Sequence, residues 1–159
     1  MSPTERIHLL QAMPFFGAIS DNSVGLILEH SETLTKDTGE YFFRQGDHAD
    51  SLYLLESGQA AIIKQTDDKE FLLRRANKGD CFGELALIDL KPRSASVRAE
   101  AACTAIKIPS AALLALYQSN PEQFLIIQMN ISRELSRRLR SADERWFKLQ
   151  TADKNLSDP

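Results

Sequence analysis

Short runs of β-forming residues recur along the middle of this 159-residue chain, from about residue 32 to residue 109. Turn-forming residues separate the runs, as in Gln45-Gly46-Asp47 and at Ser57-Gly58. Many short strands at spacings of roughly ten residues are typical of a small antiparallel barrel or jelly roll. The predicted strands are 40–43, 51–56, 59–65, 70–75, 96–100 and 103–108.

Helical periodicity flanks this region on both sides. Residues 4–30 place apolar side chains at helical spacing, with Ser20 as a predicted helix cap within this segment. After the strands, Ser110 is predicted to cap a short helix, and a second, longer helix opens with Pro121 in its first turn and extends to about Gln150. We predict one α+β, mainly β domain over residues 1–150, an antiparallel β-roll or jelly-roll barrel flanked by N-terminal helices and a long C-terminal helix. Residues 151–159 are expected to form a frayed tail.

The overall composition excludes several classes of partner. A formal net charge of −3 gives no general attraction for nucleic acid or an anionic membrane. No run approaches the roughly 20 apolar residues of a membrane span, and the first ten residues do not resemble a signal peptide. Cys81 and Cys103 lie in apparent strands and have no ligand spacing with a histidine. We therefore expect a cytoplasmic protein with no disulfide, no metal and no cofactor.

One interval between the strands breaks the regular pattern. After Phe82 ends a strand, residues 83–87 are predicted to form a single helical turn, and a loop then leads to Arg93. The first turn of a helix offers free amides to an anion, and Gly83 lets the backbone approach closely. Arg93 adds a planar fork that can bond two oxygens of one phosphate. The amides and Arg93 together predict an anion site.

Glu84 would repel a phosphate at this place unless its carboxylate accepts a hydrogen bond. A ribose hydroxyl is a suitable donor, and a deoxy analogue would leave the carboxylate unpaired at a cost of about 1–3 kcal/mol. The two opposite charges thus indicate a compact ligand that carries both ribose and phosphate. No nucleophile–base pair, metal-binding carboxylate pair or P-loop accompanies them, so we expect binding and no enzymatic activity.

A purely structural interpretation of the same residues is the alternative. In it, Leu85 and Leu87 belong to the core, Gly83 forms a turn, and Glu84 pairs with Arg93 on the surface.

The segment FGELALIDLKPRSASV resembles the phosphate-binding cassette of the cyclic-nucleotide-binding domain family. A second signature of the family is similar to Gly46-Asp47-His48-Ala49 with the downstream Gly58, and the resemblance covers about residues 5–140. It implies that Glu84 binds the ribose 2′-hydroxyl and that Arg93 binds the cyclic phosphate. The implied ligand-binding set is Phe82, Gly83, Glu84, Leu85, Ala86, Arg93, Ser94 and Ala95.

The base of the implied ligand is less closely specified. We expect cAMP, with cGMP as the alternative, because Ser94 is compatible with either. The adenine-contacting Thr-Ser pair of the catabolite activator has no counterpart on the long helix, which leaves Arg138, Ala142 and Glu144 as candidate neighbours of the base.

The long C-terminal helix resembles the dimerisation helix of catabolite-activator-like proteins. Its apolar residues step by four and three, as in a coiled-coil seam. One interpretation is a homodimer, and the other is that the stripe packs on the roll of its own chain. The stripe consists of Ile131, Leu135, Leu139, Ala142, Trp146 and Leu149.

The leading functional hypothesis is a regulatory sensor whose C-terminal helices change conformation when cAMP binds, with an unidentified protein as its partner. A helix-turn-helix domain, which follows the long helix in the transcription factors of the family, does not follow it in this sequence, so we expect no direct contact with nucleic acid. The alternatives are an interaction or structural domain with a vestigial pocket, and the effector part of a truncated DNA-binding regulator.

Overall fold

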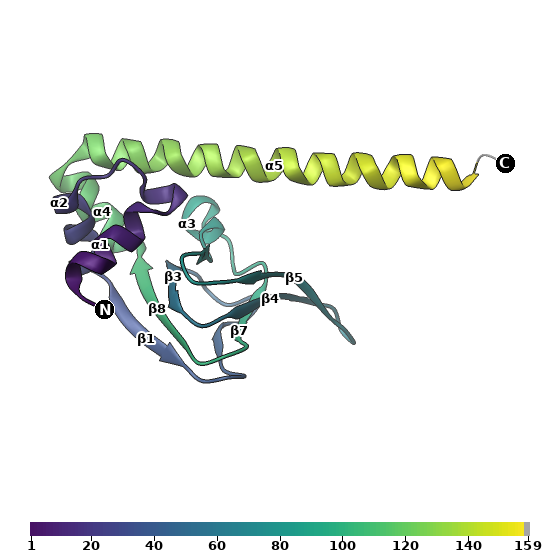
Figure 1. Ribbon diagram of the computed structural model, residues 1–159, viewed down its shortest axis with the longest axis horizontal. Helices are drawn as coiled ribbons and strands as arrows, with labels where there is room; N and C mark the ends of the chain where they lie inside the picture. Colours follow the sequence, from purple (N-terminus) through teal and green to yellow (C-terminus); the bar gives the residue numbers. More distant parts are fainter. Residues whose placement is uncertain (158–159) are drawn as a thin grey trace.

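The computed structural model describes residues 1–157 and confirms a β-roll between two helical segments (Figure 1). The paired strands are antiparallel and form two four-stranded sheets. The first sheet has the order β1-β8-β3-β6, made by Glu32–Lys36, Cys103–Pro109, Ser51–Ser57 and Cys81–Phe82. The second has the order β2-β7-β4-β5, made by Tyr41–Phe43, Ser96–Ala99, Ala60–Gln65 and Glu70–Ala76.

Strand β3 lies between two hydrophobic cores, which explains its uninterrupted apolar sequence. Leu52 and Leu54 join the core beneath the helices, whereas Tyr53 and Leu55 join the core inside the roll. Successive side chains of a strand point to opposite faces, so a strand covered on both faces shows no polar alternation. The roll and the helices are therefore packed against opposite faces of the same strand.

The N-terminal segment, predicted to be helical over residues 4–30, forms three short helices. They are α1 at Pro3–Gln11, the 3-10 helix η1 at Pro14–Phe16 and α2 at Asp21–Glu29. Met13 is extended, with φ −85° and ψ 147°, because a residue before proline is forced away from the α conformation. Ser20 caps α2 as predicted, its side chain accepting a hydrogen bond from the backbone N–H of Ser23.

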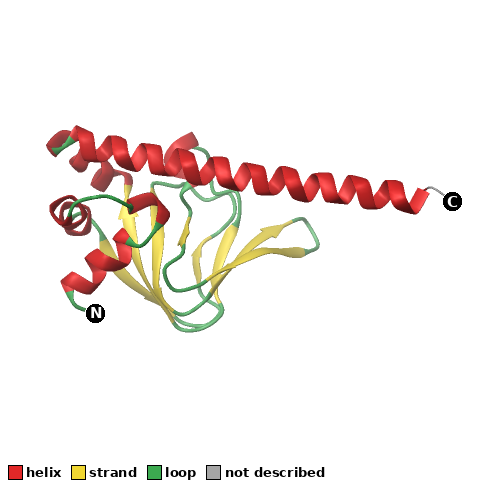
Figure 2. Ribbon diagram, turned by 45° about the horizontal axis from the view of Figure 1, so that its top comes forward, coloured by secondary structure: helices red, strands yellow, loops and turns green. Residues whose placement is uncertain are grey.

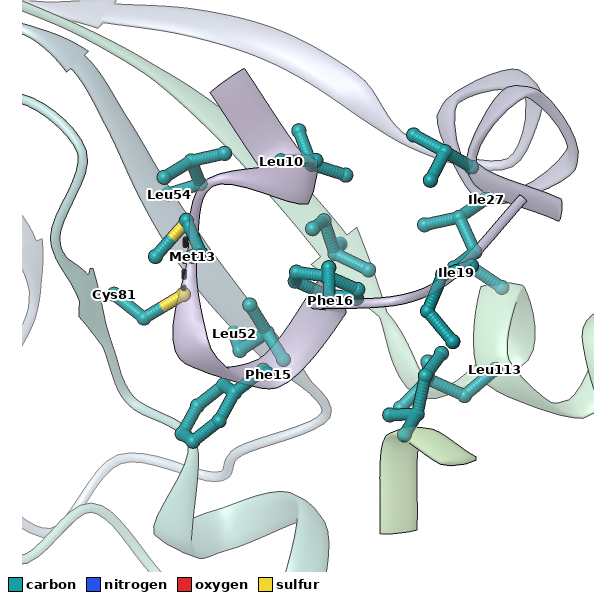
Figure 3. Packing of buried hydrophobic residues seen from close by; sticks show 14 of the residues in the cluster. Leu10, Met13, Phe15, Phe16, Ile19, Ile27, Leu52, Leu54, Cys81 and Leu113 are labelled. Atoms are coloured by element: carbon teal, nitrogen blue, oxygen red, sulfur yellow. Dashed lines mark hydrogen bonds between the residues drawn. The ribbon is translucent and has the colours of Figure 1, made fainter. Parts of the chain in front are cut away.

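The segment around η1 packs on the outer face of the first sheet (Figure 3). Phe15 and Phe16 are almost completely buried there, and the Sγ of Cys81 lies 3.8 Å from the Sδ of Met13. Because Cys81 directly precedes the predicted cassette, this packing places η1 beside it.

Two further helices follow the roll, α4 at Ser110–Ser119 and α5 at Pro121–Ser157. Helix α5 continues beyond Gln150, its predicted end, and includes residues of the predicted frayed tail. No glycine or proline stands between residues 122 and 158, so no helix breaker interrupts the chain there. The remaining part of the predicted tail, residues 158–159, lies outside the described residues. Figure 2 shows α5 passing over the roll and extending beyond it, in the direction in which the β4–β5 hairpin also points.

The apolar stripe of α5 divides into a covered and an uncovered half. Ile131 is buried against η1 and Leu135 is partly buried, and the Nδ2 of Asn130 donates to the carbonyl oxygens of Phe15 and Gly17 at 3.2 and 2.8 Å. From Leu139 to Lys154 every residue is exposed. The intrachain interpretation thus holds for the first half of the stripe. The second half is uncovered within the described chain, and its pairing with a second copy stays a prediction. Within residues 1–157 no helix has the length and apolarity to cross a membrane.

Candidate functional site

A cavity of about 480 Å³ opens between the cassette, strand β5 and helix α5. Its volume falls within the range of about 300–1,000 Å³ typical of ligand pockets. Seven of the eight predicted residues line it, namely Phe82, Gly83, Glu84, Leu85, Arg93, Ser94 and Ala95. The eighth, Ala86, lies in helix α3 (Leu85–Asp89), and its side chain is outside the described part of the structure. The structure therefore brings the predicted set together, and its contact with a ligand stays a prediction.

Gly83 makes the turn from strand β6 into α3. Its φ is +78°, a left-handed conformation that costs a residue with a side chain roughly 1–2 kcal/mol. A Cβ at this position would lie 2.6 Å from the Nη1 of Arg93 and 3.2 Å from the Cε1 of Phe43. Glycine is thus required here both by the backbone and by the close approach of the arginine.

Arg93 is a buried cation whose direct partners are neutral. Only 5% of its surface is exposed, and its Nη1 and Nη2 donate to the carbonyl oxygens of Gly83 at 2.8 Å and Ser51 at 2.7 Å. Its guanidinium carbon lies 4.0 Å from the centroid of the Phe43 ring, in cation–π contact. Burial lowers the pKa of Arg93, and its buried Nε has no hydrogen-bond partner among the described residues. A charge in this setting is favourable for an anion that enters the cavity.

The backbone of Arg93 is held by the second family signature. The Arg93 N–H donates to the Asp47 carbonyl at 2.9 Å, and the Gly46 N–H donates to the Arg93 carbonyl at 2.8 Å. Asp47 in turn accepts the N–H of Arg44 on its Oδ2 at 2.9 Å. The two sequence signatures therefore meet in space, since the turn at residues 44–47 positions the arginine of the cassette.

Glu84 is 4% exposed and forms an ion pair with Arg138 of helix α5. Arg138 also approaches Glu134, one helical turn earlier, at 3.4 Å. Burial lowers the pKa of Arg138 while the carboxylates of Glu84 and Glu134 raise it, and the net direction is upward. Glu84 thus has a cationic partner within its own chain. The free-energy cost that we predicted for a deoxy analogue, which would leave this carboxylate unpaired, is therefore reduced.

The structural interpretation of the cassette is contradicted on two points. Glu84 and Arg93 are both buried and each bonds to other groups, so they do not form a surface ion pair. Leu85 is 44% exposed and lines the cavity, so it is not a core residue. Leu87 does pack against the helical core, as that interpretation requires.

Aromatic rings from strands β2 and β3 pack against Phe82, the first residue of the cassette. Phe82 is 1% exposed and stacks on Tyr53, with ring centroids 5.3 Å apart and planes 5° from parallel. The Phe42 ring meets Phe82 edge-on at 5.0 Å. Phe82 lines the pocket and also holds the start of the cassette in place through these contacts.

Sequence reasoning missed several residues of the cavity wall. Leu73 and Arg74 line it from β5, Phe43 from β2, and Arg145 from α5. Arg145 could have been found from helical geometry, because it follows Arg138 by seven residues and so shares its face. Of the three α5 residues predicted as neighbours of the base, Arg138 lines this cavity, whereas Ala142 and Glu144 do not. Within the described residues, no group of histidine, cysteine and acidic side chains is suited to hold a metal ion.

Comparisons with known proteins agree with the geometry. The family model "Cyclic nucleotide-binding domain" matches residues 34–120. A cAMP-dependent protein kinase regulatory subunit of Emericella nidulans is 37% identical over 91 residues, which are 57% of this chain and 22% of that protein. The cAMP-activated global transcriptional regulator CRP of Salmonella typhimurium is 33% identical over 136 residues, 84% of this chain and 63% of that protein.

Solved structures show the same similarity. The Thermus thermophilus catabolite activator protein has a TM-score of 0.75 and 30% identity, over 86% of this chain and 63% of that one. The sensor domain of the regulator DNR from Pseudomonas aeruginosa has a TM-score of 0.73 and 26% identity, over 87% of this chain and 93% of that one. The chain spans less than two thirds of the length of the curated relatives above. With a matching family model, a shared fold and the cassette in its cavity, the chain belongs to the cyclic nucleotide-binding domain family.

Proposed function

We propose that this chain is a sensor that binds a cyclic ribonucleotide, with cAMP as its ligand and cGMP as the alternative. The observation that carries the proposal is the pair of buried opposite charges, Arg93 and Glu84, on the wall of one cavity. A cyclic phosphate suits Arg93, and a ribose 2′-hydroxyl suits Glu84. The relatives named above for cAMP support the choice of base.

The hydrogen bonds of Arg93 leave its guanidinium able to bind a phosphate. Its Nη1 and Nη2 donate to carbonyl groups, and its Nε is free within the described structure. A phosphate oxygen is a stronger acceptor than a carbonyl and brings the negative charge that this buried cation lacks. The ligand therefore gains a charge-assisted contact without a large movement of the side chain.

Glu84 links the ligand to helix α5. It pairs with Arg138, a contact that joins the helix to the cassette. A ribose hydroxyl at Glu84 competes for the same carboxylate oxygens and changes the energy of that contact. We propose that this change shifts α5 relative to the roll, by as much as the ligand's affinity differs between the two positions of the helix.

The output of such a sensor would pass through α5. Its exposed apolar residues Leu139, Trp146 and Leu149 favour a second copy of this chain, paired helix to helix. Sedimentation equilibrium should report a dimer that Leu139→Asp weakens and Ser136→Asp leaves intact. A monomer at all concentrations would support intrachain packing alone and an unidentified protein partner.

The remaining features support a binding role and an intracellular place. No catalytic constellation was found in the sequence, and the relatives named above carry the names of regulatory proteins. The two cysteines are free and buried, which suits a reducing cytoplasm.

Thermal unfolding against a panel of nucleotides tests the proposal. A ligand at 100 times its Kd stabilises the folded state by about 2.7 kcal/mol, which raises the melting temperature by about 5–10 °C in a chain of this size. We expect that shift with cAMP and a much smaller one with 5′-AMP, whose phosphate is not held in a ring. No shift with any cyclic nucleotide would support a vestigial pocket and an interaction role.

A further inference from the structure

The wall of the cavity beyond Glu84 contains three arginines that also line a second cavity. This second space, of about 410 Å³, lies between η1, the β5–β6 turn and α5. Arg74, Arg138 and Arg145 line both cavities, so the two spaces share these side chains as a common border. Arg74 comes from β5, and the other two come from one face of α5.

A nucleotide placed by the proposed contacts would direct its base to this border. Its phosphate lies at Arg93, its ribose at Glu84, and Glu84 is already in contact with Arg138. Arg145 lies two helical turns further along the same face of α5, roughly 10 Å from Arg138 along the axis. The base of the nucleotide therefore faces a cavity wall built from β5 and α5.

The polar side chains of this wall offer donors, while nearby carboxylates are engaged. Arg145 has no hydrogen bond or ion pair with the side chains that the structure describes, and Arg74 has one hydrogen bond, from its Nη2 to the Cys81 carbonyl at 3.2 Å. The four carboxylates that line the two cavities all accept bonds already. Glu84 accepts from Arg138, Glu134 from Arg137 and Arg138, Asp80 from the Asn77 N–H, and Asp89 from the Lys91 N–H.

A guanidinium has five N–H donors and no acceptor, which makes it selective for one kind of base edge. Guanine and hypoxanthine present two neighbouring acceptors, O6 and N7, and arginine can bond both at once. Adenine presents N7 beside an amino group, which is itself a donor and needs an acceptor. A wall of arginines thus favours the binding of a 6-oxo purine. A wall of hydroxyl groups, which both donate and accept, would not favour it in this way.

We propose that Arg145, together with Arg74, contacts the base and sets its selectivity, so that cGMP and cIMP bind within about tenfold of cAMP. The inference rests on the proposed function and concerns the base end of the same pocket. Arg145 is the main determinant, since its guanidinium is exposed and has no other partner in the described structure.

Isothermal titration of cAMP, cGMP and cIMP into the wild-type chain and Arg145→Gln tests the inference. Glutamine has a donor and an acceptor that match N6 and N7 of adenine, so the variant should lower the affinity for cGMP and cIMP and preserve that for cAMP. The ratio of the cGMP and cAMP dissociation constants should rise by about tenfold. cIMP separates the contact with O6 from any contact with the 2-amino group of guanine.

Arg140→Gln is the matched control, because Arg140 is exposed on α5 and lines neither cavity. The inference is overturned if wild-type chain binds cAMP but neither 6-oxo nucleotide, or if Arg145→Gln changes the ratio no more than the control does. Arg74→Gln, measured with its melting temperature, should change the ratio in the same direction. Failure of all three nucleotides to bind the wild-type chain would instead reject the proposed function, and the inference with it.

Discussion

Replacing Gly83 by alanine should damage both the fold and the site, and the structure separates the two causes. The positive φ of +78° alone costs an alanine about 1–2 kcal/mol. The new Cβ would also stand 2.6 Å from the Nη1 of Arg93, well inside contact distance, so that the guanidinium has to move. That movement breaks the 2.8 Å bond to the Gly83 carbonyl, and a hydrogen bond to a charged group contributes about 1.5–3 kcal/mol.

Gly39→Ala is the matched control for this substitution. Gly39 has a φ of +90°, and a Cβ built on it meets nothing within 4 Å. Urea unfolding should therefore show a loss of about 1–2 kcal/mol for Gly39→Ala and a further loss of about 1.5–3 kcal/mol for Gly83→Ala. Titration with cAMP should show weaker binding for Gly83→Ala only. Equal losses of stability and unchanged binding in both variants would refute the proposed steric link between Gly83 and Arg93.

Two other ion pairs give further predictions on stability. The Glu56 carboxylate is 4% exposed and lies 2.9 Å from the Nε of Arg6. Arg6→Met leaves this buried carboxylate without its cation and should lower the free energy of unfolding, measured in urea, by about 2 kcal/mol. A loss below about 0.5 kcal/mol would contradict this expectation. The hydrogen bond from Arg137 holds the pKa of Glu134 below its usual value, so its stabilisation is present above about pH 4.3 and is lost as the pH falls through the lowered pKa. Glu134→Gln should therefore flatten the fall in stability below about pH 4.3, and only slightly because Arg137 is exposed; an unchanged pH profile would show that the pair contributes nothing.

Local patterns in the sequence predict the roll and the cassette well. The turn residues divide the chain into strands close to those observed, and the exchange of strand for helix at residues 83–87 marks the site. The bounds of the short helix differ, since α3 spans Leu85–Asp89. Strand β1 is absent from the predicted strands, because its sequence ETLTK is half polar and gains its place from pairing with β8.

Contacts between distant parts of the chain explain what the sequence did not reveal. Glu84 and Arg138 are 54 residues apart, and no periodicity connects a cassette loop to a position on α5. The same limit applies to Arg74, whose place on the cavity wall depends on how the β4–β5 hairpin folds under the helix. The break between α1 and α2, in contrast, was readable from Pro14, since the residue before a proline leaves the α conformation.

Isothermal titration of cAMP into the wild-type chain, Arg93→Ala and Arg93→Lys tests the central claim most directly. The claim is that the buried guanidinium of Arg93 binds the cyclic phosphate of the ligand. The wild-type chain should bind one cAMP, Arg93→Ala should lose at least about tenfold in affinity, and lysine should restore only part of it because it lacks the planar fork. Binding of cAMP that is equally tight in all three proteins would contradict the claim.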